Sequence, residues 1–297
     1  MAKIVLITGC STGFGYAAAL KFARQGDWVV ATMRGIEGKN KPHAESLAKA
    51  AAEENLYLRV VELDVCSDAS VDGAAATVLG EIGTPDIIIN NAGVMYLGIA
   101  EAYTAQEYTH QLDVNVVGVH RVSRAFLPAM RSNGEGLFIN VTSVAGRLSG
   151  PTFAIYCASK WALEAYSLGL RQELASSGID VVVVEPGPFR TELFGQAPSP
   201  KDEDGRTATY PKALTDVMES MGANFTAMLS DENLPNDPEL VVDTFIELAG
   251  MEPGHRPFRT AVGLDFGVSE YNKAAEEFDA SVMVGMGVAE AAKLVRK

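Results

Sequence analysis

Tyr156 and Lys160 are the two residues whose types and spacing most directly suggest chemistry. They are four positions apart in a stretch with helical periodicity, so their side chains are expected on one face of a helix, one turn apart. A tyrosine hydroxyl has a pKa of about 10 and is a poor base at neutral pH, whereas a nearby cation stabilises its phenolate. We therefore predict that Lys160 lowers the pKa of Tyr156, which then acts as a general acid or base. Ser143 follows a strand pattern thirteen residues earlier, where its hydroxyl could hydrogen-bond a substrate oxygen.

A glycine-rich segment lies between the first strand pattern and the first helical pattern. Thr8–Gly15 reads TGCSTGFG, with the spacing TGxxxGxG rather than GxGxxG. Glycines allow positive φ and let the backbone approach a pyrophosphate, which is then held at the N-terminus of the helix. The position of this segment in a strand–loop–helix unit predicts a dinucleotide site. The contacts are expected from Gly9, Ser11, Thr12, Gly13, Phe14 and Gly15.

The end of the second strand pattern indicates which dinucleotide is preferred. An acidic residue usually holds the adenosine ribose of NAD at this point. The run Val30–Arg34 contains no acid and ends in an arginine, whose guanidinium could grip a 2′-phosphate. Ser11 could assist at that phosphate. We predict NADP(H) as the preferred cofactor, with NAD(H) as the alternative if Arg34 is only an exposed loop residue.

Near-continuous apolar runs alternate with longer helical patterns along most of the chain. Such runs are typical of a parallel sheet covered on both faces, and the helices between them form right-handed crossovers. We therefore predict an α/β fold: a single Rossmann-type doubly wound parallel sheet with helices on both faces. The segment from Pro257 onward is expected to add a seventh strand and a final helix. The other expected strands are Ile4–Ile7, Trp28–Thr32, Tyr57–Leu63, Asp86–Ile89, Leu137–Val141 and Val181–Val184, and the expected helices are Ala17–Arg24, Glu45–Glu54, Val71–Ile82, Leu112–Met130 and Ile155–Ser176.

One domain is expected over residues 1–297, with a lid-like insertion near its C-terminal end, over about residues 190–235. Within it, the polar run Gln196–Arg206 predicts a surface loop. Leu214–Leu229 has a helical pattern with an apolar stripe, which indicates either packing against the core or a flexible lid over an apolar substrate. The stripe consists of Met218, Met221, Phe225 and Met228.

Composition excludes several other classes of protein. The 297 residues include 24 Lys+Arg and 38 Asp+Glu, giving a formal net charge of −14, which argues against nucleic-acid and anionic-membrane partners. Three cysteines without CxxC spacing and four histidines without ligand spacing predict neither a disulfide framework nor a metal site. No apolar run is long enough for a signal peptide or a membrane span, so a cytoplasmic protein is expected.

At this point the chain resembles a known family, the classical short-chain dehydrogenases/reductases. The motifs occur in the family's order: TGxxxGxG, NNAG at Asn90–Gly93, Asn115, Ser143, YxxxK and Pro186–Gly187. The resemblance implies a catalytic tetrad of Asn115, Ser143, Tyr156 and Lys160, with Asn115 positioning a water. It also implies homodimers or homotetramers that associate through the helices holding Asn115 and Tyr156. Further cofactor contacts are implied at Asp64, Val65, Asn91, Ala92, Gly93, Tyr156, Lys160, Pro186, Gly187 and Thr191.

The run ATMR before Gly35 is similar to the NADP-using hydroxysteroid and retinol dehydrogenase branch of that family. Mostly apolar residues follow the strand ends, which favours a hydrophobic ketone or aldehyde and the corresponding alcohol as substrates. Arg147 could instead bind a carboxylate or lie at the surface. Two other functions are left open: an NADP(H)-binding sensor on the same fold and a sugar-nucleotide epimerase-like enzyme. The expected substrate contacts are Ser143, Ala145, Arg147, Met95, Tyr96, Phe189 and Phe194.

Overall fold

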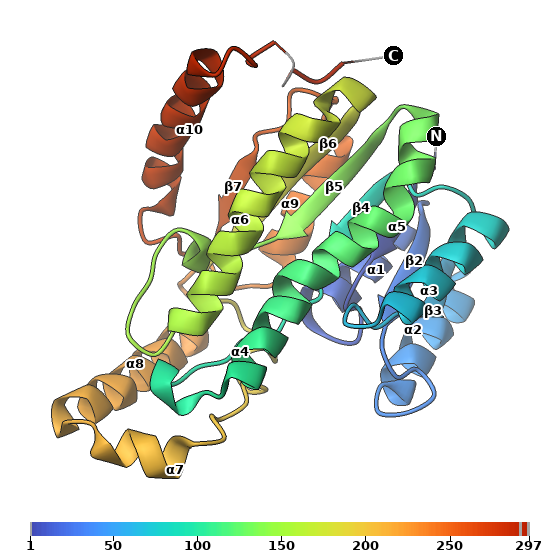
Figure 1. Cartoon of the computed structure of the whole chain (residues 1–297). Helices are drawn as coiled ribbons and strands as arrows, with labels where there is room; N and C mark the ends of the chain where they lie inside the picture. The colour runs from blue at the N-terminus through green and yellow to red at the C-terminus, as the bar shows by residue number, and fades with distance from the viewer. Residues whose placement is uncertain (1, 291–292, 296–297) are drawn as a thin grey trace.

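Seven parallel strands form one sheet in the computed structural model, which describes residues 2–290 and 293–295. The strand order is β3-β2-β1-β4-β5-β6-β7 (Figure 1). The chain first builds outward from β1 to β3 and then returns to build β4 to β7 on the other side, which creates a switch point between β1 and β4. The predicted doubly wound α/β fold is thereby confirmed. The strands are Ile4–Ile7, Trp28–Met33, Leu58–Glu62, Ile87–Asn90, Gly136–Val141, Ile179–Pro186 and Arg259–Val262, numbered β1 to β7.

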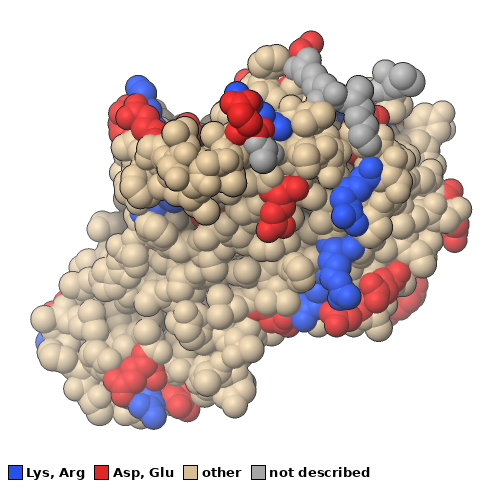
Figure 2. All heavy atoms as spheres, turned by 45° about the horizontal axis from the view of Figure 1, so that its top comes forward, with Lys and Arg blue, Asp and Glu red and all other residues tan. Residues whose placement is uncertain are grey.

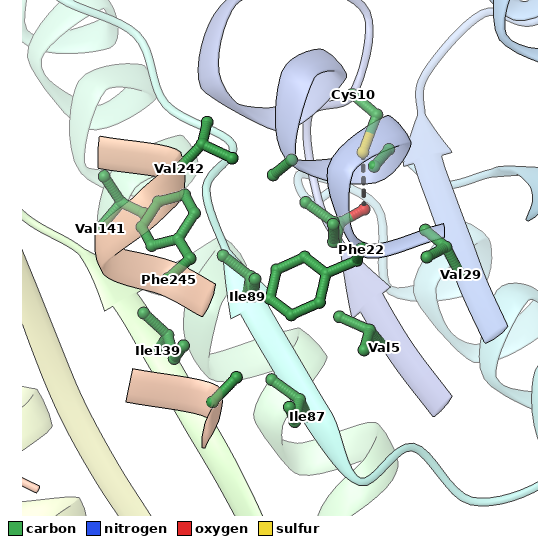
Figure 3. Close-up of a cluster of buried hydrophobic side chains, with 14 of the residues drawn as sticks. Val5, Cys10, Phe22, Val29, Ile87, Ile89, Ile139, Val141, Val242 and Phe245 are labelled. Atoms are coloured by element: carbon green, nitrogen blue, oxygen red, sulfur yellow. Dashed lines mark hydrogen bonds between the residues drawn. The ribbon is translucent and has the colours of Figure 1, made fainter. Parts of the chain in front are cut away.

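Helices cover both faces of this sheet because alternate strand residues point to opposite sides. Val5 and Ile7 pack against α1 and α9, and Figure 3 shows Phe22 of α1 and Phe245 of α9 among the strand side chains on this face. Leu6 belongs to the opposite cluster, which α3, α5 and α6 cover. The ten α-helices of the described chain are Gly13–Arg24, Lys41–Glu54, Asp68–Glu81, Ala105–Leu112, Gly118–Asn133, Ala154–Leu174, Glu203–Arg206, Lys212–Ser230, Glu239–Gly250 and Val268–Gly285, numbered α1 to α10.

Two expectations about secondary structure need correction. The helix expected over Leu112–Met130 is interrupted: a π-helical turn, Asp113–Val117, separates α4 from α5. Such turns are frequent at functional sites, and this one carries Asn115. The segment expected as a loop over Gln196–Arg206 ends in the short helix α7, which Arg206 fastens to Glu101 by an ion pair of 2.8 Å.

The segment after β6 departs from the regular layers. Helices α7 and α8 extend beyond the carboxyl edge of the sheet, and α10 runs beside β7 and α6 (Figure 1). None of the described residues of α8 is fully buried, so this helix is not part of the core. Among the described helices, none is both long and apolar enough to cross a membrane.

Candidate active site

The glycine-rich segment forms a tight cradle beside the switch point. Gly9 and Gly13 have φ values of +73° and +58°, which L side chains rarely adopt. Helix α1 begins at Gly13, so its free backbone N–H groups lie at the cavity, where an anion is favoured. A Cβ at Gly15 would lie 2.5 Å from the Gly9 carbonyl oxygen. Gly15 therefore permits close packing of the loop, and it does not line the cavity itself.

Asn91 holds this cradle from the end of β4. Its side-chain amide donates hydrogen bonds to the carbonyl oxygens of Thr8 at 2.9 Å and Gly9 at 3.2 Å. Its backbone N–H donates to the Thr8 hydroxyl at 3.0 Å. Through these bonds, the segment Asn91–Gly93 and the glycine loop line one wall of the same cavity.

Basic side chains gather just after the end of β2. Arg34 lines the cavity, as expected, together with Lys39 and His43, which the sequence analysis did not single out. In the described part of the chain, no ion pair joins any of the three to an acid, whereas their neighbour Lys41 pairs with Glu37 at 3.8 Å. A group of basic side chains without acidic partners is suited to an anionic ligand.

Tyr156, Lys160 and Ser143 meet in the middle of the cavity. Tyr156 and Lys160 lie one turn apart on α6, as their spacing predicts, and both are buried. Ser143 follows β5 and hydrogen-bonds the Tyr156 hydroxyl. The Lys160 ammonium donates to the carbonyl oxygen of Val141 at 2.9 Å. These groups could hold a substrate oxygen and transfer a proton to it.

The pKa of Tyr156 does not follow the sequence-based expectation. Burial raises it to about 12, and the hydrogen bond with Ser143 only partly opposes this. The prediction that Lys160 lowers the pKa of Tyr156 is therefore wrong for this structure: burial, Ser143 and Cys157 account for the shift, and Lys160 does not contribute to it. Burial lowers the pKa of Lys160 itself to about 8. The spacing correctly predicted that the two side chains lie one turn apart on one helix. The direction of both pKa shifts, however, is set by burial, which removes water from the charged form.

Asn115 lies behind the cavity wall and does not line it. Its carboxamide accepts a hydrogen bond from the Val94 N–H at 2.9 Å and donates to the Val94 carbonyl and the Ser159 hydroxyl, both at 3.0 Å. The polar groups of the buried Asn115 side chain are therefore satisfied by Val94 and Ser159. A Cβ at Gly93 would lie 3.4 Å from Asn115 Oδ1 and 3.8 Å from Lys160 Nζ. Gly93 therefore lies next to both side chains, and a larger residue there would crowd them.

The other end of the cavity is apolar. Of the expected substrate contacts, Met95, Ala145 and Phe194 cluster with Tyr156 at this end. Phe189 also lines the cavity, but it packs on Phe14 of the glycine loop, with the ring centroids 5.6 Å apart. The cavity has a volume of about 610 Å³, within the range of small-molecule sites. Phe225 of α8 packs against Phe153 and Phe194, with both ring-centroid distances 5.4 Å. The lining residues that the sequence did not single out include Phe153 and Leu193, which are close in the chain to expected contacts, and Phe266, which is distant from them.

Two expected substrate contacts lie elsewhere. The Tyr96 side chain is buried between Tyr103 and His110, and its hydroxyl hydrogen-bonds His110 Nδ1 at 3.0 Å. The Arg147 guanidinium is nearly buried between Glu164 and Glu185. Neither residue lines the cavity, so the expectation that they contact the substrate is corrected. Their neighbours in the sequence do line it, but buried polar partners direct these two side chains away from it.

Comparison with known proteins agrees with this arrangement. Residues 3–202 match the short chain dehydrogenase family. This chain belongs to the short-chain dehydrogenase family. This short-chain dehydrogenase is 34% identical over 256 residues to the uncharacterized oxidoreductase YusZ of Bacillus subtilis, covering 83% of the chain and 84% of that protein. It is also 37% identical over 221 residues to retinol dehydrogenase 8 of Bos taurus, covering 73% of the chain and 67% of that protein.

Solved structures agree with the family and differ in their cofactor. A short-chain dehydrogenase from Streptomyces avermitilis superimposes with a TM-score of 0.74 at 32% identity, covering 97% of this chain and 99% of that one. A serine dehydrogenase complexed with NADP⁺ has a TM-score of 0.70 at 26% identity, covering 88% and 94%. A family member from Burkholderia phymatum in complex with NAD shares the fold, with a TM-score of 0.74 at 24% identity and coverage of 94% and 95%. This chain is thus an oxidoreductase of the short-chain dehydrogenase family, and proteins that share its fold bind NADP⁺ or NAD.

Proposed function

We propose that this short-chain dehydrogenase interconverts a hydrophobic ketone or aldehyde and the corresponding alcohol with NADP(H). One observation carries the proposal: a single cavity has basic side chains at one end, buried Tyr156, Lys160 and Ser143 in the middle, and apolar side chains at the other end. A dinucleotide and an apolar substrate could therefore meet at the tyrosine hydroxyl.

The residues at the cofactor end fit a dinucleotide. The positive φ of Gly9 and Gly13 and the N-terminus of α1 suit a pyrophosphate. A Cβ at Gly13 would lie 3.8 Å from the Thr191 side chain, so Thr191 lies close above this loop. The adenine is assigned to Asp64 and Val65. The nicotinamide end is assigned to Ala92, Gly93, Tyr156, Lys160, Pro186 and Gly187, all of which line the cavity.

Each catalytic side chain has a defined task in reduction. When bound, NADPH would supply the hydride that reaches the carbonyl carbon. Ser143 would hold the carbonyl oxygen by a hydrogen bond where negative charge develops. Tyr156 would give its proton to that oxygen, and its raised pKa keeps it protonated at neutral pH. Lys160 would bind the ribose hydroxyls, and Asn115 would position a water next to it.

The basic group at the end of β2 favours NADP(H) over NAD(H). Arg34, Lys39 and His43 line the cavity without an acidic partner among the described residues, and a 2′-phosphate would provide one. Ser11, which also lines the cavity, is assigned an assisting contact. NAD(H) is the alternative cofactor.

The apolar end supports a hydrophobic substrate and a lid. Helix α8 reaches the cavity through Met221 and Phe225, while it contributes no fully buried residue to the core. Of the two interpretations of its apolar stripe, the lid is the one that we propose. The insertion over about residues 190–235 then covers the substrate within a single domain.

The test is NADPH consumption against a panel of steroid, aromatic, aliphatic and quinone carbonyls, with Tyr156→Phe alongside. We expect turnover of apolar carbonyls by the wild type and none by the variant, because the phenyl ring cannot donate a proton. NADPH binding should be nearly unchanged in Tyr156→Phe, as measured by fluorescence titration. Tight NADPH binding without turnover in either direction would favour a sensor, and turnover of sugar nucleotides alone would favour an epimerase-like enzyme.

A further inference from the structure

A buried group of charged residues lies directly behind the Ser143 turn. Arg147 follows that turn, and its side chain is only 9% exposed. Its guanidinium lies 3.4 Å from a carboxylate oxygen of Glu164 on α6 and 3.4 Å from one of Glu185 on β6. Both carboxylates are at most 2% exposed. Burying charges is expensive, and such groups are weak sources of stability, so a role in geometry has to be considered.

The geometry of Arg147 links the catalytic side chains to one another. The short 3₁₀ turn Val144–Gly146 begins just after Ser143. Arg147 follows its last residue and closes the turn, because its N–H donates to the Val144 carbonyl oxygen at 3.0 Å. The same turn packs on α6 so closely that a Cβ at Gly146 would lie 3.3 Å from the Lys160 carbonyl oxygen. Glu164 is one turn beyond Lys160 on that helix. Arg147 therefore connects the Ser143 turn to the segment of α6 that carries Tyr156 and Lys160.

The C-terminal helix α10 completes this group from outside. The Tyr271 ring of α10 lies 5.7 Å from the Arg147 guanidinium carbon, and Trp161 of α6 lies 6.0 Å from it. These distances are those of cation–π contacts. The Asn272 side chain donates a hydrogen bond to Glu185. A helix more than a hundred residues after Ser143 thus covers the cation next to the Ser143 turn.

We propose that Arg147 is a positioning residue for the reaction, an inference that rests on the proposed function. By bridging Glu164 and Glu185, it fixes the Ser143 turn against the Lys160 segment of α6, and Tyr271 of α10 holds Arg147 in that place. Arg147 does not line the cavity, so it acts through the position of Ser143 rather than through contact with ligands.

The first test compares Arg147→Met with Arg171→Met. Arg171 of α6 is a matched control because it too pairs with a buried acid, Asp180, at 2.7 Å. Arg171 lies about three turns beyond Lys160, so it is remote from the Ser143 turn. Both substitutions should lower the melting temperature. Only Arg147→Met should lower kcat, by about tenfold or more, because a hydroxyl displaced by a fraction of an ångström no longer meets the developing charge. Its KM for the carbonyl and its Kd for NADPH should stay within about threefold of the wild type, since the lost interaction belongs to the transition state.

A second pair of variants keeps the test independent of folding. Tyr271 is half exposed, so Tyr271→Ala removes little from the core, and Tyr271→Phe keeps the ring over Arg147. We expect Tyr271→Ala to lower kcat several-fold and Tyr271→Phe to retain the wild-type value. Equal kcat in Arg147→Met and Arg171→Met, or in the two Tyr271 variants, would overturn the positioning role while the proposed function stands. Absence of any turnover by the wild type would overturn the proposed function and this role with it.

Discussion

Burial shifts the proton affinities of Tyr156 and Lys160 in opposite directions. It raises the pKa of the tyrosine hydroxyl to about 12 and lowers the pKa of the lysine ammonium to about 8, in each case because the charged form loses water. A nearby acid, Glu164, partly opposes the shift at Lys160. Near neutral pH both groups are therefore protonated, which is the state that reduction of a carbonyl requires.

The Lys160 shift predicts how stability depends on pH. The ordinary pKa of the ammonium is 10.5 and the folded value is about 8, so between these values the unfolded chain binds more protons at this site than the folded chain does. Stability contributed by this site should therefore rise as pH increases through that window. We expect the free energy of unfolding of the wild type to rise relative to Lys160→Met between pH 8 and pH 10, because the other titrating groups are common to both proteins. Urea unfolding of both proteins at several pH values measures this, and parallel curves would contradict it.

Arg34 gives a prediction about cofactor choice. Replacing it by aspartate puts a negative charge where we assign the 2′-phosphate, and should weaken NADPH binding by about 10- to 100-fold, the range expected for a lost charge-assisted hydrogen bond. NADH binding should change little or improve. Fluorescence titration with both nucleotides measures the ratio of affinities. Lys41→Glu is the control, because Lys41 lies in the same segment but does not line the cavity; if both variants changed the ratio equally, the contact at Arg34 would be refuted.

Helix α8 has a weak connection to the core and reaches the substrate end of the cavity. Its Phe225 ring lies between Phe153 at the start of α6 and Phe194 after β6. Since α8 buries none of its described residues fully, its position depends on such ring contacts and on the bonds of the loop that follows it. In that loop, the Asn236 side chain donates to the Met228 and Asp231 carbonyl oxygens at 2.6 and 2.9 Å.

Phe225→Ala tests the lid. Loss of this ring should lower kcat/KM for large apolar carbonyls by about tenfold, as expected for a substantial apolar contact, and should affect small carbonyls much less. The Kd for NADPH should not change, because Phe225 lies at the apolar end. Met218→Ala is the control on the same helix, since Met218 is half-buried but does not line the cavity. A uniform loss for all substrates in both variants would indicate a structural role for α8 instead.

Surface charge is unevenly distributed on the molecule. On the face in Figure 2, uncharged side chains cover most of the surface, and the charged groups lie in small clusters, several of which contain both basic and acidic side chains. Helix α6 contributes exposed Trp161 and Ala165, and the π-helical turn before α5 contributes Val117, which is 40% exposed. Exposed apolar side chains on neighbouring helices are typical of a subunit contact.

We predict that the chain forms homodimers or homotetramers through α5 and α6. Ala165→Arg would place a large charged side chain in that contact and should yield monomers, as measured by size-exclusion chromatography with light scattering. Ala280→Arg is the control because Ala280 is equally small and exposed but lies on α10. A wild type that is monomeric at micromolar concentration, or two variants with the same mass, would refute this contact.

Local pattern was sufficient to predict most of this protein. Apolar runs located six of the seven strands, because a strand buried on both faces has to be apolar throughout. The seventh, Arg259–Val262, lies in the segment from Pro257 onward, where a further strand was expected without bounds. Motif spacing indicated the family and placed Tyr156, Lys160 and Ser143 at one cavity. The π-helical turn at Asn115 was missed, since helical periodicity hardly changes over one irregular turn.

Tertiary structure alone decided three further properties. It reversed the expected pKa shift of Tyr156, because the extent of burial is set by all the elements packed around a group. It directed Arg147 toward Glu164 and Glu185 and away from the cavity, although its neighbour Ala145 lines that cavity. It also brought Lys39, Phe225 and Phe266 to the same cavity from distant parts of the chain. Sequence thus determined which local segments form and which chemistry they carry, whereas burial and side-chain direction depend on contacts between segments far apart in the chain.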